Sequence, residues 1–248
     1  MYLLKFKLKS TGLALFVITF LFTSHVKSLD KFDRADSVSD YFAGILSFNE
    51  NEYDKSYKFF KNLDGLESKH PDYSAKYLYS LVNSGNFREA FNYSKKLERQ
   101  NINIFESRLV LGIYYLKHSK LELAKENFQK AKETKRSVLN EYVTNSLTNW
   151  SNLKTSNLNN SMIELKKIDE RFENLKKIQN IFLNCYFDSP NTESLYKELI
   201  SNKTTDFSRY NYFYASFMAN SGKTKEAKKI VNSALKSYPR NLKLNQLK

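Results

Sequence analysis

Hydrophobic residues recur along this chain at intervals of three and four positions, with polar residues between them. Two clear examples are the sets Tyr41, Phe42, Ile45, Leu46, Phe48 and Leu109, Leu111, Ile113, Leu116. Such spacing places hydrophobic side chains on one face of an α-helix. The chain also has only 6 glycines and 3 prolines among 248 residues, which leaves little material for hairpin turns. The pattern therefore predicts an all-α fold.

The helical pattern is itself repeated. The segments NENEYDKSYKFFKNL (49–63), NSGNFREAFNYSKKL (83–97) and KHSKLELAKENFQKA (117–131) follow one another at a constant interval. This interval is the period of about 34 residues that is typical of paired-helix repeats. A helix pair of this length cannot bury its own apolar face, so neighbouring pairs must stack on one another. The sequence thus predicts an array of stacked helix–turn–helix units.

One copy, LVLGIYYLKHSKLELAKENFQKA (109–131), resembles a tetratricopeptide repeat (TPR). It has Leu111, Gly112 and Tyr115 at the family's L-G-x-x-Y positions and Ala124 and Phe128 at its A-x-x-x-F positions. Small residues at such positions let two helices cross closely, and large ones fill the layer between pairs. The resemblance implies TPR-type helix pairs stacked in a right-handed superhelix. The same register marks, in the other copies, Gly44, Phe60, Gly85, Ala90, Gly222, Ala227 and Pro239.

The resemblance covers nearly all of residues 35–242, strongly in four copies and weakly in two. Two features depart from the family pattern: Asp40 and Arg108 stand at its tryptophan position, and only the last copy has the terminal proline at its usual place. The expected organisation is a signal peptide at 1–28, a short linker at 29–36, three regular TPR-like repeats at 37–138, two degenerate helical repeats at 139–206, and a TPR-like repeat followed by the start of a further helix at 207–248.

That further helix is suggested by Leu242, Leu244 and Leu247, which have the spacing of another apolar helix face. The last full copy ends with Ile230, Val231 and Leu235, which would need a neighbour. Terminal units of a stacked array require a polar outer face. We therefore expect either that the array continues in a longer protein or that this end packs against a partner.

The first 28 residues have the order of a secretory signal peptide, which is basic, then apolar, then small. Lys5, Lys7 and Lys9 precede the uncharged stretch 12–22, and Val26 and Ser28 lie at the −3 and −1 positions of a cleavage site. The apolar stretch has 11 residues, fewer than the roughly 20 that cross a bilayer. We expect export to the periplasm or cell envelope with cleavage after Ser28. The alternative is an uncleaved anchor helix at 13–22.

The formal net charge of +14 favours anionic partners. Without residues 1–28 the chain keeps 36 basic and 26 acidic residues, a net charge of +10. Acidic residues are interleaved with the basic ones, as on solvated helix faces, so nucleic acid is not an expected partner. The single cysteine, Cys185, cannot form an internal disulfide. It lies in the apolar run IFLNCYF, which indicates a buried thiol.

No arrangement of residues indicates catalysis or metal binding. His70 and His118 fall in expected loops without cysteine or paired carboxylates at metal-ligand spacing. The tripeptide Gly222-Lys223-Thr224 ends like a phosphate-binding loop, but Phe217 occupies the position of that motif's first glycine. No nucleophile elbow, zinc pattern or dinucleotide-binding fingerprint is present. We expect a non-enzymatic protein without cofactors.

The resemblance implies a binding surface instead, because the first helices of a TPR array line a concave face. By the family pattern, the side chains facing that groove are Tyr41, Ile45, Phe48, Asn49, Tyr79, Val82, Asn83, Leu109, Ile113, Leu116, Lys117, Arg209 and Tyr212. Members that bind chaperone C-termini use Lys and Asn where this chain has Ile45 and Tyr79, so that role is not supported.

The leading hypothesis from the sequence is an interaction scaffold of the bacterial envelope, similar to exported TPR proteins of Gram-negative bacteria. The groove set is apolar and aromatic with asparagine at its rim, which suits an extended or helical peptide of a protein partner. The alternative is a peripheral membrane component held by the uncleaved anchor and a basic surface.

Overall fold

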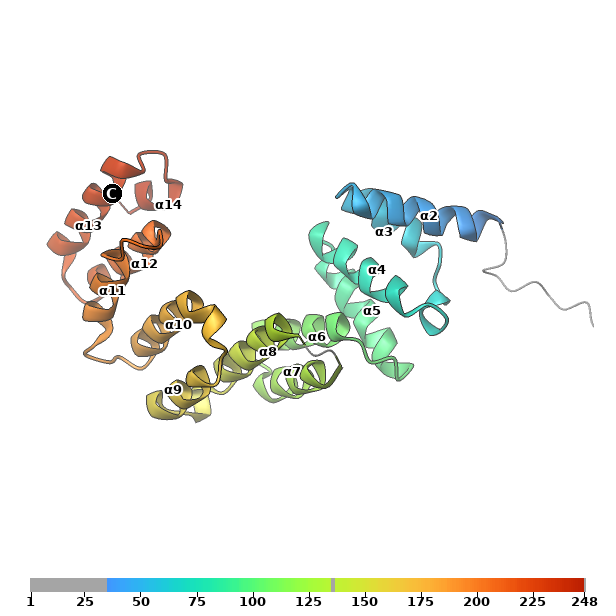
Figure 1. Ribbon diagram of the computed structural model, residues 1–248, viewed down its shortest axis with the longest axis horizontal. Coiled ribbons are helices and arrows are strands. Elements are labelled where there is room, and N and C mark those ends of the chain that lie inside the picture. The colour runs from blue at the N-terminus through green and yellow to red at the C-terminus, as the bar shows by residue number, and fades with distance from the viewer. Residues whose placement is uncertain (1–34, 135–136, 248) are drawn as a thin grey trace, which may run out of the picture. The chain divides into compact units, whose positions relative to one another are not determined.

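The computed structural model describes residues 35–134 and 137–247. Within these residues the chain forms thirteen α-helices, α2 to α14, joined by short turns and 3-10 segments, and no strand (Figure 1). The all-α prediction is confirmed. The predicted signal peptide, the alternative anchor at 13–22 and most of the linker lie outside the described residues.

The chain divides into two compact units, with the boundary between Asn86 and Phe87. Among its described residues, 35–86, the first unit contains in chain order α2 (Ala35–Asn49), α3 (Tyr53–Lys61), the 3-10 segment η2 (Leu66–Ser68) and α4 (Pro71–Asn83). Helix α3 packs against both α2 and α4. The predicted second repeat is therefore shared, with its first helix in this unit and its second helix in the next.

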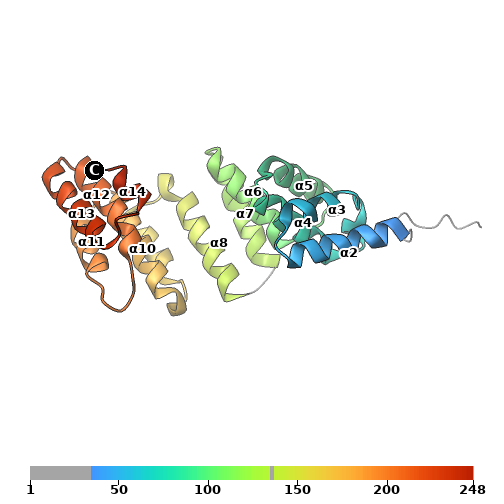
Figure 2. The ribbon, with the colours of Figure 1, turned by 90° about the horizontal axis from the view of Figure 1, so that it is seen from above.

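The second unit begins with the second helix of that repeat, and four successive helix pairs and one short terminal helix follow (Figure 2). In chain order its helices are α5 (Phe87–Arg99), α6 (Phe105–Lys117), α7 (Leu121–Thr134), α8 (Val138–Ser151), α9 (Leu158–Lys166), α10 (Glu173–Tyr186), α11 (Thr192–Ile200), α12 (Asn211–Asn220), α13 (Thr224–Ser237) and α14 (Leu242–Asn245).

The period of the sequence is visible in the backbone at the turns inside five of the six described helix pairs. Asn51, Gly85 and Ser119 follow one another at this period and have left-handed φ values of 61°, 75° and 58°. Asp188 and Gly222, also one period apart, have φ values of 50° and 77°. At each of these turns the next backbone N–H donates to a carbonyl five residues back, as Glu52 does to Ser47 at 2.8 Å. This bond satisfies a carbonyl that the end of the first helix leaves without a partner.

The first degenerate copy lacks this turn. Leu153 lies one period after Ser119, and there the chain forms the 3-10 segment η3 (Leu153–Thr155) between α8 and α9. The Leu153 side chain is buried. It belongs to a hydrophobic cluster with Leu165, Ile168 and Leu183. The copy is degenerate because its turn contributes a leucine to the core instead of a left-handed glycine or asparagine.

Small residues permit close contact where the helices of a pair cross. A Cβ atom added to Gly44 would lie 2.6 Å from the Phe60 ring, and one added to Gly112 would lie 2.3 Å from the Phe128 ring. Both phenylalanine side chains are fully buried. Each aromatic ring therefore occupies the space that a side chain on the facing helix would need.

The terminal helix α14 covers the last full repeat. Leu244 is fully buried and packs with Ala215, Val231 and Ala234, while Ile230, Leu235 and Leu247 border this cluster. Asn241 caps α14, because its side chain accepts a hydrogen bond from the Leu244 backbone at 3.2 Å. Helix α14 is thus a neighbour of Val231 in the structure.

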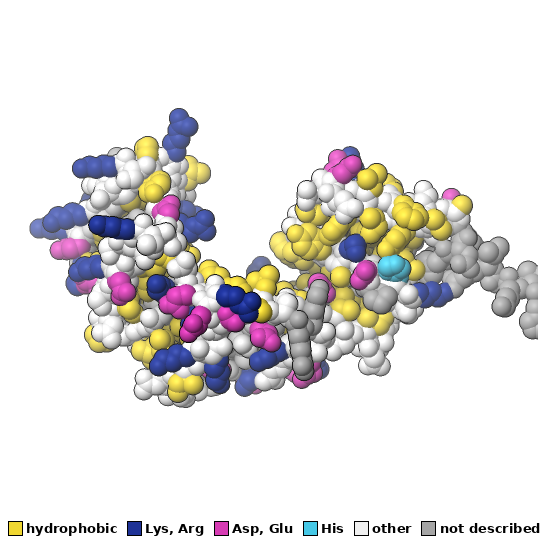
Figure 3. Space-filling view, viewed as in Figure 1, with side chains coloured by type: hydrophobic (Ala, Val, Ile, Leu, Met, Phe, Trp, Pro, Cys, Tyr) yellow, Lys and Arg dark blue, Asp and Glu magenta, His cyan; other side chains and the backbone are white. Residues whose placement is uncertain are grey.

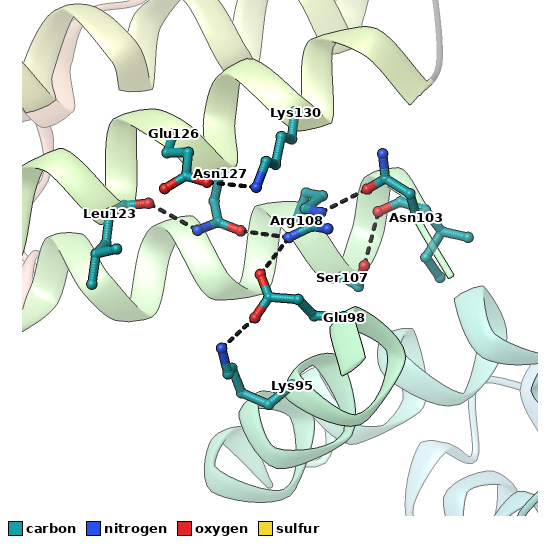
Figure 4. Close-up of polar contacts among 10 residues, drawn as sticks. Lys95, Glu98, Asn103, Ser107, Arg108, Leu123, Glu126, Asn127 and Lys130 are labelled. Carbon is teal, nitrogen blue, oxygen red and sulfur yellow. Dashed lines mark hydrogen bonds and ion pairs between the residues drawn. The ribbon is translucent and has the colours of Figure 1, made fainter. Parts of the chain in front are cut away.

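A polar network joins α5, α6 and α7 around Arg108, at the family's tryptophan position (Figure 4). The guanidinium is almost completely buried and donates to Glu98 at 2.7 Å, to Asn103 at 2.6 Å and to Asn127 at 3.2 Å. Lys95 binds the second oxygen of Glu98. A buried charge is tolerated only when it is paired and hydrogen-bonded. Arg108 therefore links three helices by polar contacts where the family uses an apolar ring.

Candidate protein-binding surface

In the first unit the structure brings three aromatic rings together at one end of the helices. The centroids of Phe48 and Tyr79 are 5.3 Å apart, and Tyr53 lies 5.9 Å from Phe48 and 5.5 Å from Tyr79. Tyr79 is 48% exposed, while Phe48 and Tyr53 are both half-buried. Phe48 and Tyr79 were predicted from the family pattern, whereas Tyr53, at the start of α3, was not placed in the groove. We call these three residues the aromatic cluster.

The aromatic cluster borders a polar hollow. Its volume is about 390 Å³, and it is lined by Asn51, Glu52, Tyr53, Asp54, Lys55, Asn83 and Ser84. The Tyr53 hydroxyl donates to the Asn51 side chain at 2.6 Å, which fixes the ring at the edge of the hollow. Partial burial and the neighbouring Tyr79 raise the pKa of Tyr53, so this hydroxyl stays protonated at neutral pH. The first unit thus presents aromatic rings beside side chains that can donate and accept hydrogen bonds.

The other predicted residues of this unit divide into solvent-facing and packed ones. Asn49 and Asn83 lie at the ends of their helices, and the Asn83 side chain donates to the Tyr79 carbonyl at 2.8 Å. Ile45 is half-buried. Tyr41 turns toward the neighbouring helices: its hydroxyl lies 3.2 Å from Nε2 of His70, and its ring contacts Phe60. Burial and then the charge of Asp72 raise the pKa of Tyr41.

Val82, the remaining predicted residue of the first unit, is half-buried near the end of α4. Hydrophobic side chains gather over the part of the molecule that α2, α3 and α4 form (Figure 3). Besides Tyr79, the exposed ones on these helices are Val38, Phe42 and Leu46, all on α2. No helix of the described residues is long and apolar enough to cross a membrane.

In the second unit, the predicted residues of α6 form an apolar strip along one face of that helix. Leu109 and Leu116 are half-buried and Ile113 is 47% exposed. Lys117, at the end of the helix, is exposed. Leu111 and Gly112 are buried, and Gly112 lies against the Phe128 ring of α7. The predicted groove residues of α6 are thus less buried than Leu111 and Gly112.

No groove residue was predicted in the degenerate copies. One period after Leu109, Ile113 and Leu116 stand Val143, Leu147 and Trp150 on α8, all half-buried. The sequence alone could have identified these three residues, because each lies one repeat period after a residue of the α6 strip. They were missed because the copy lacks the glycine turn by which the regular repeats are recognised.

The last two predicted residues lie before and at the start of α12. Arg209 is exposed in the 3-10 segment η5 (Ser208–Tyr210), and Tyr212 is half-buried with the Lys243 ammonium 5.9 Å from its ring centre. Beside them Phe182 and Phe213 make an edge-to-face contact at 5.3 Å. Phe213 is 44% exposed. The aromatic character of this end comes mainly from residues that the family pattern did not indicate.

The described residues offer no cluster of three His, Cys, Asp or Glu side chains that could hold a metal ion. Cys185 is half-buried, and burial, with a smaller effect of Asp188, raises the pKa of its thiol. Such a thiol is protonated at neutral pH and weakly nucleophilic.

No protein-family model matches this sequence, and no curated protein matches it significantly. Solved structures of TPR-containing proteins do match it. A chain of the APC/C hetero-tetramer Cut9–Hcn1 aligns over 88% of this chain with 14% identity and a TM-score of 0.51. A mutant of MamA aligns over 85% with 13% identity and a TM-score of 0.41, and the Naa15/Naa10 complex bound to HypK-THB over 85% with 14% identity and a TM-score of 0.38.

The matched part is 44% of the Cut9–Hcn1 chain, 96% of the MamA chain and 33% of the chain from the Naa15/Naa10 complex. The present chain thus spans less than half of the first of these. The likeness to the Cut9–Hcn1 structure, together with the regular period of helix pairs, shows that this chain has a TPR-like fold.

Proposed function

We propose that this protein is a non-enzymatic scaffold that binds a segment of another protein on the solvent-facing side of its first helices. The observation that carries the proposal is the aromatic cluster, in which Phe48 and Tyr79 of two successive first helices meet at 5.3 Å with Tyr79 half exposed. Exposed aromatic rings contribute strongly to protein–protein contacts, because a large apolar area is immobilised at small entropic cost.

The partner that fits is a peptide segment with apolar side chains and accessible backbone groups. Apolar side chains can pack on the aromatic cluster and on the Leu109–Ile113–Leu116 strip of α6. Asn49 and Asn83 are the last residues of α2 and α4, the helices that carry Phe48 and Tyr79. Their side-chain amides can pair with backbone groups of a bound peptide. The TPR-like fold supports the proposal, because such arrays present their first helices as a binding face.

Site-specific photo-crosslinking would test the proposal. A photoreactive phenylalanine would replace Tyr79 or Ile113, which are 48% and 47% exposed, and as a matched control Ile163 on α9, which is 55% exposed. In an extract of the native cells, adducts with one protein are expected from positions 79 and 113 and not from position 163. Equal labelling at all three positions, or none at 79 and 113, would show that the first-helix face is not the binding surface.

We further propose that the scaffold works in the bacterial envelope after removal of residues 1–28. The support is the order of basic, apolar and small residues in that segment. The second candidate is a peripheral membrane component that keeps the segment as an anchor. The positive net charge of the chain supports this candidate. The intact mass of the purified native protein distinguishes them: a chain starting at Leu29 is expected, and a chain that retains residues 1–28 would contradict export with cleavage.

A further inference from the structure

The outer face of α13 carries a row of lysines. Successive residues of a helix are rotated by about 100°. The buried Ala227, Val231 and Ala234 therefore define one side of α13. Lys225, Lys229 and Lys236 lie away from that side, and all three are exposed. We call these three residues the lysine ridge.

The lysine ridge is the centre of a strongly basic end. Between Gly222 and Leu247 the chain has seven basic residues and one acidic residue, Glu226. Lys223 pairs with Glu193 of α11 at 2.5 Å, whereas the described part of the chain supplies no carboxylate partner for the ridge lysines. Figure 3 shows Lys and Arg side chains projecting around the end of the second unit that α13 and α14 form.

A comparison with an earlier repeat shows that the fold does not set this charge. Helix α7 is the equivalent second helix of an earlier repeat, since Ala124 and Phe128 occupy the repeat positions of Ala227 and Val231. At the three positions equivalent to the lysine ridge, α7 carries Glu122, Glu126 and Glu133, which are also exposed. The same structural position thus has opposite charge in two repeats, so the fold itself does not require lysine there.

A strongly exposed apolar side chain lies at the same end. Leu242 is 80% exposed, and it stands between Arg240 and Lys243, which are exposed as well. Its helix, α14, is held on α13 by the buried Leu244. An isolated leucine in water gains nothing from this position. Beside basic side chains, however, it is placed as in surfaces that insert into the interface of an anionic bilayer.

We propose that the end formed by α13 and α14 binds the surface of an anionic phospholipid bilayer. The lysine ridge would face the lipid phosphates, and Leu242 would enter the boundary between headgroups and acyl chains. A bilayer fits better than an acidic protein, because fluid lipids need no match to the lysine spacing and accept the leucine as well. The inference does not depend on the peptide-binding surfaces of the first helices.

Vesicle co-sedimentation would test this inference with the full chain and with a chain that begins at Leu29 and keeps every described residue. The vesicles would be phosphatidylcholine alone or mixed with phosphatidylglycerol. We expect binding of the shorter chain to the anionic vesicles only, because the lysine ridge acts through charge. Replacing all three ridge lysines by glutamine should weaken that binding by at least about tenfold, since each lysine near the surface contributes measurably. Leu242→Ser should weaken it as well.

The matched control is the triple variant Lys154→Gln, Lys166→Gln and Lys203→Gln, which removes the same charge from exposed positions outside α13 and α14. It should keep anionic-vesicle binding within about twofold of the original chain. Circular dichroism would confirm that all variants remain helical. Equal losses in the ridge and control triples would reduce the effect to net charge and overturn the proposal. So would absence of vesicle binding, or binding to a polyglutamate peptide that is as strong as vesicle binding and is unaffected by Leu242→Ser.

Discussion

At the scale of single residues, the packing of the helix pairs depends on the absence of a side chain at Gly44 and Gly112. Each faces the buried ring of a phenylalanine on the next helix, Phe60 or Phe128. At the equivalent positions of the last full repeat the pair is Ala215 and Val231. Alanine is larger than the glycine it replaces, and valine is smaller than the phenylalanine it replaces. The combined volume of the two side chains is what the crossing allows, so the residues at these positions must change together.

This constraint predicts the effect of Gly112→Ala. The added methyl group would lie 2.3 Å from the Phe128 ring, which forces the ring or the helices to move. We expect a loss of about 1–3 kcal/mol in the free energy of unfolding. Chemical denaturation monitored by circular dichroism would measure it. In a background carrying Phe128→Leu the same substitution should cost clearly less, because the shorter side chain leaves space; an equal cost in both backgrounds would mean that the two residues do not compete.

At the scale of secondary-structure elements, two sets of side-chain contacts hold helices together in ways that the repeat pattern does not indicate. One is the network in which Arg108 of α6 contacts Glu98 of α5 and Asn127 of α7. The other is α14, whose Leu244 closes the hydrophobic cluster of the last repeat. The first stands at the position where the family pattern has a tryptophan.

The Arg108 network predicts a dependence of stability on pH. Burial alone would raise the pKa of Glu98, but hydrogen bonds from Lys95 and Arg108 outweigh it and hold the pKa below its ordinary value of 4.5. A group whose pKa is lowered by folding stabilises the protein above that ordinary value, and this contribution is lost as the pH falls through the lowered value. Stability from this source should therefore decline from about pH 4.5 downward.

The variant Glu98→Gln isolates this contribution. We expect it to lower the free energy of unfolding at pH 7 by about 1–2 kcal/mol, because one charged hydrogen-bond acceptor is lost. Its stability should also change less than that of the original chain between pH 5 and pH 3, roughly the range in which a glutamate titrates. The exposed Glu122 provides the control, since Glu122→Gln should leave both the stability and its pH profile unchanged. A Glu98→Gln profile that follows the original chain would argue against the network.

The terminal helix predicts opposite results for two neighbouring leucines. Leu244 is fully buried and Leu242 is 80% exposed. We expect Leu244→Ala to cost about 2 kcal/mol or more, as for other buried leucines. Leu242→Ala should have no measurable effect on unfolding. The same denaturation experiment compares them, and a similar cost for both would show that α14 does not close the repeat in solution.

At the scale of the whole molecule, a repeat array couples each unit mainly to its neighbours, so a local loss of packing should remain local. Hydrogen exchange would show this in the Leu244→Ala variant. We expect faster exchange in α12, α13 and α14, and unchanged exchange in α2, α3 and α4. Faster exchange throughout the chain would indicate a single cooperative core instead, and would contradict the repeat-array description.

Much of the fold could be read from the sequence, because the information is local and periodic. The spacing of hydrophobic residues predicts helices, and the regular interval between copies predicts that they come in pairs. The residues Gly85 and Gly222 mark two of the turns, and both have the left-handed φ values that such turns require. The expected binding positions followed from the family pattern alone, and they remain predictions.

The tertiary structure decided features that depend on contacts between distant residues. Ser119 forms the same left-handed turn as glycine, although serine has no preference for that conformation. Arg108 is buried because Glu98 and Asn127, from two other helices, satisfy its charge. Tyr53 joins the aromatic cluster because the turn after α2 brings it beside Phe48 and Tyr79. Periodicity thus determined which elements form, whereas the pairing of specific side chains across helices was set only when those elements packed.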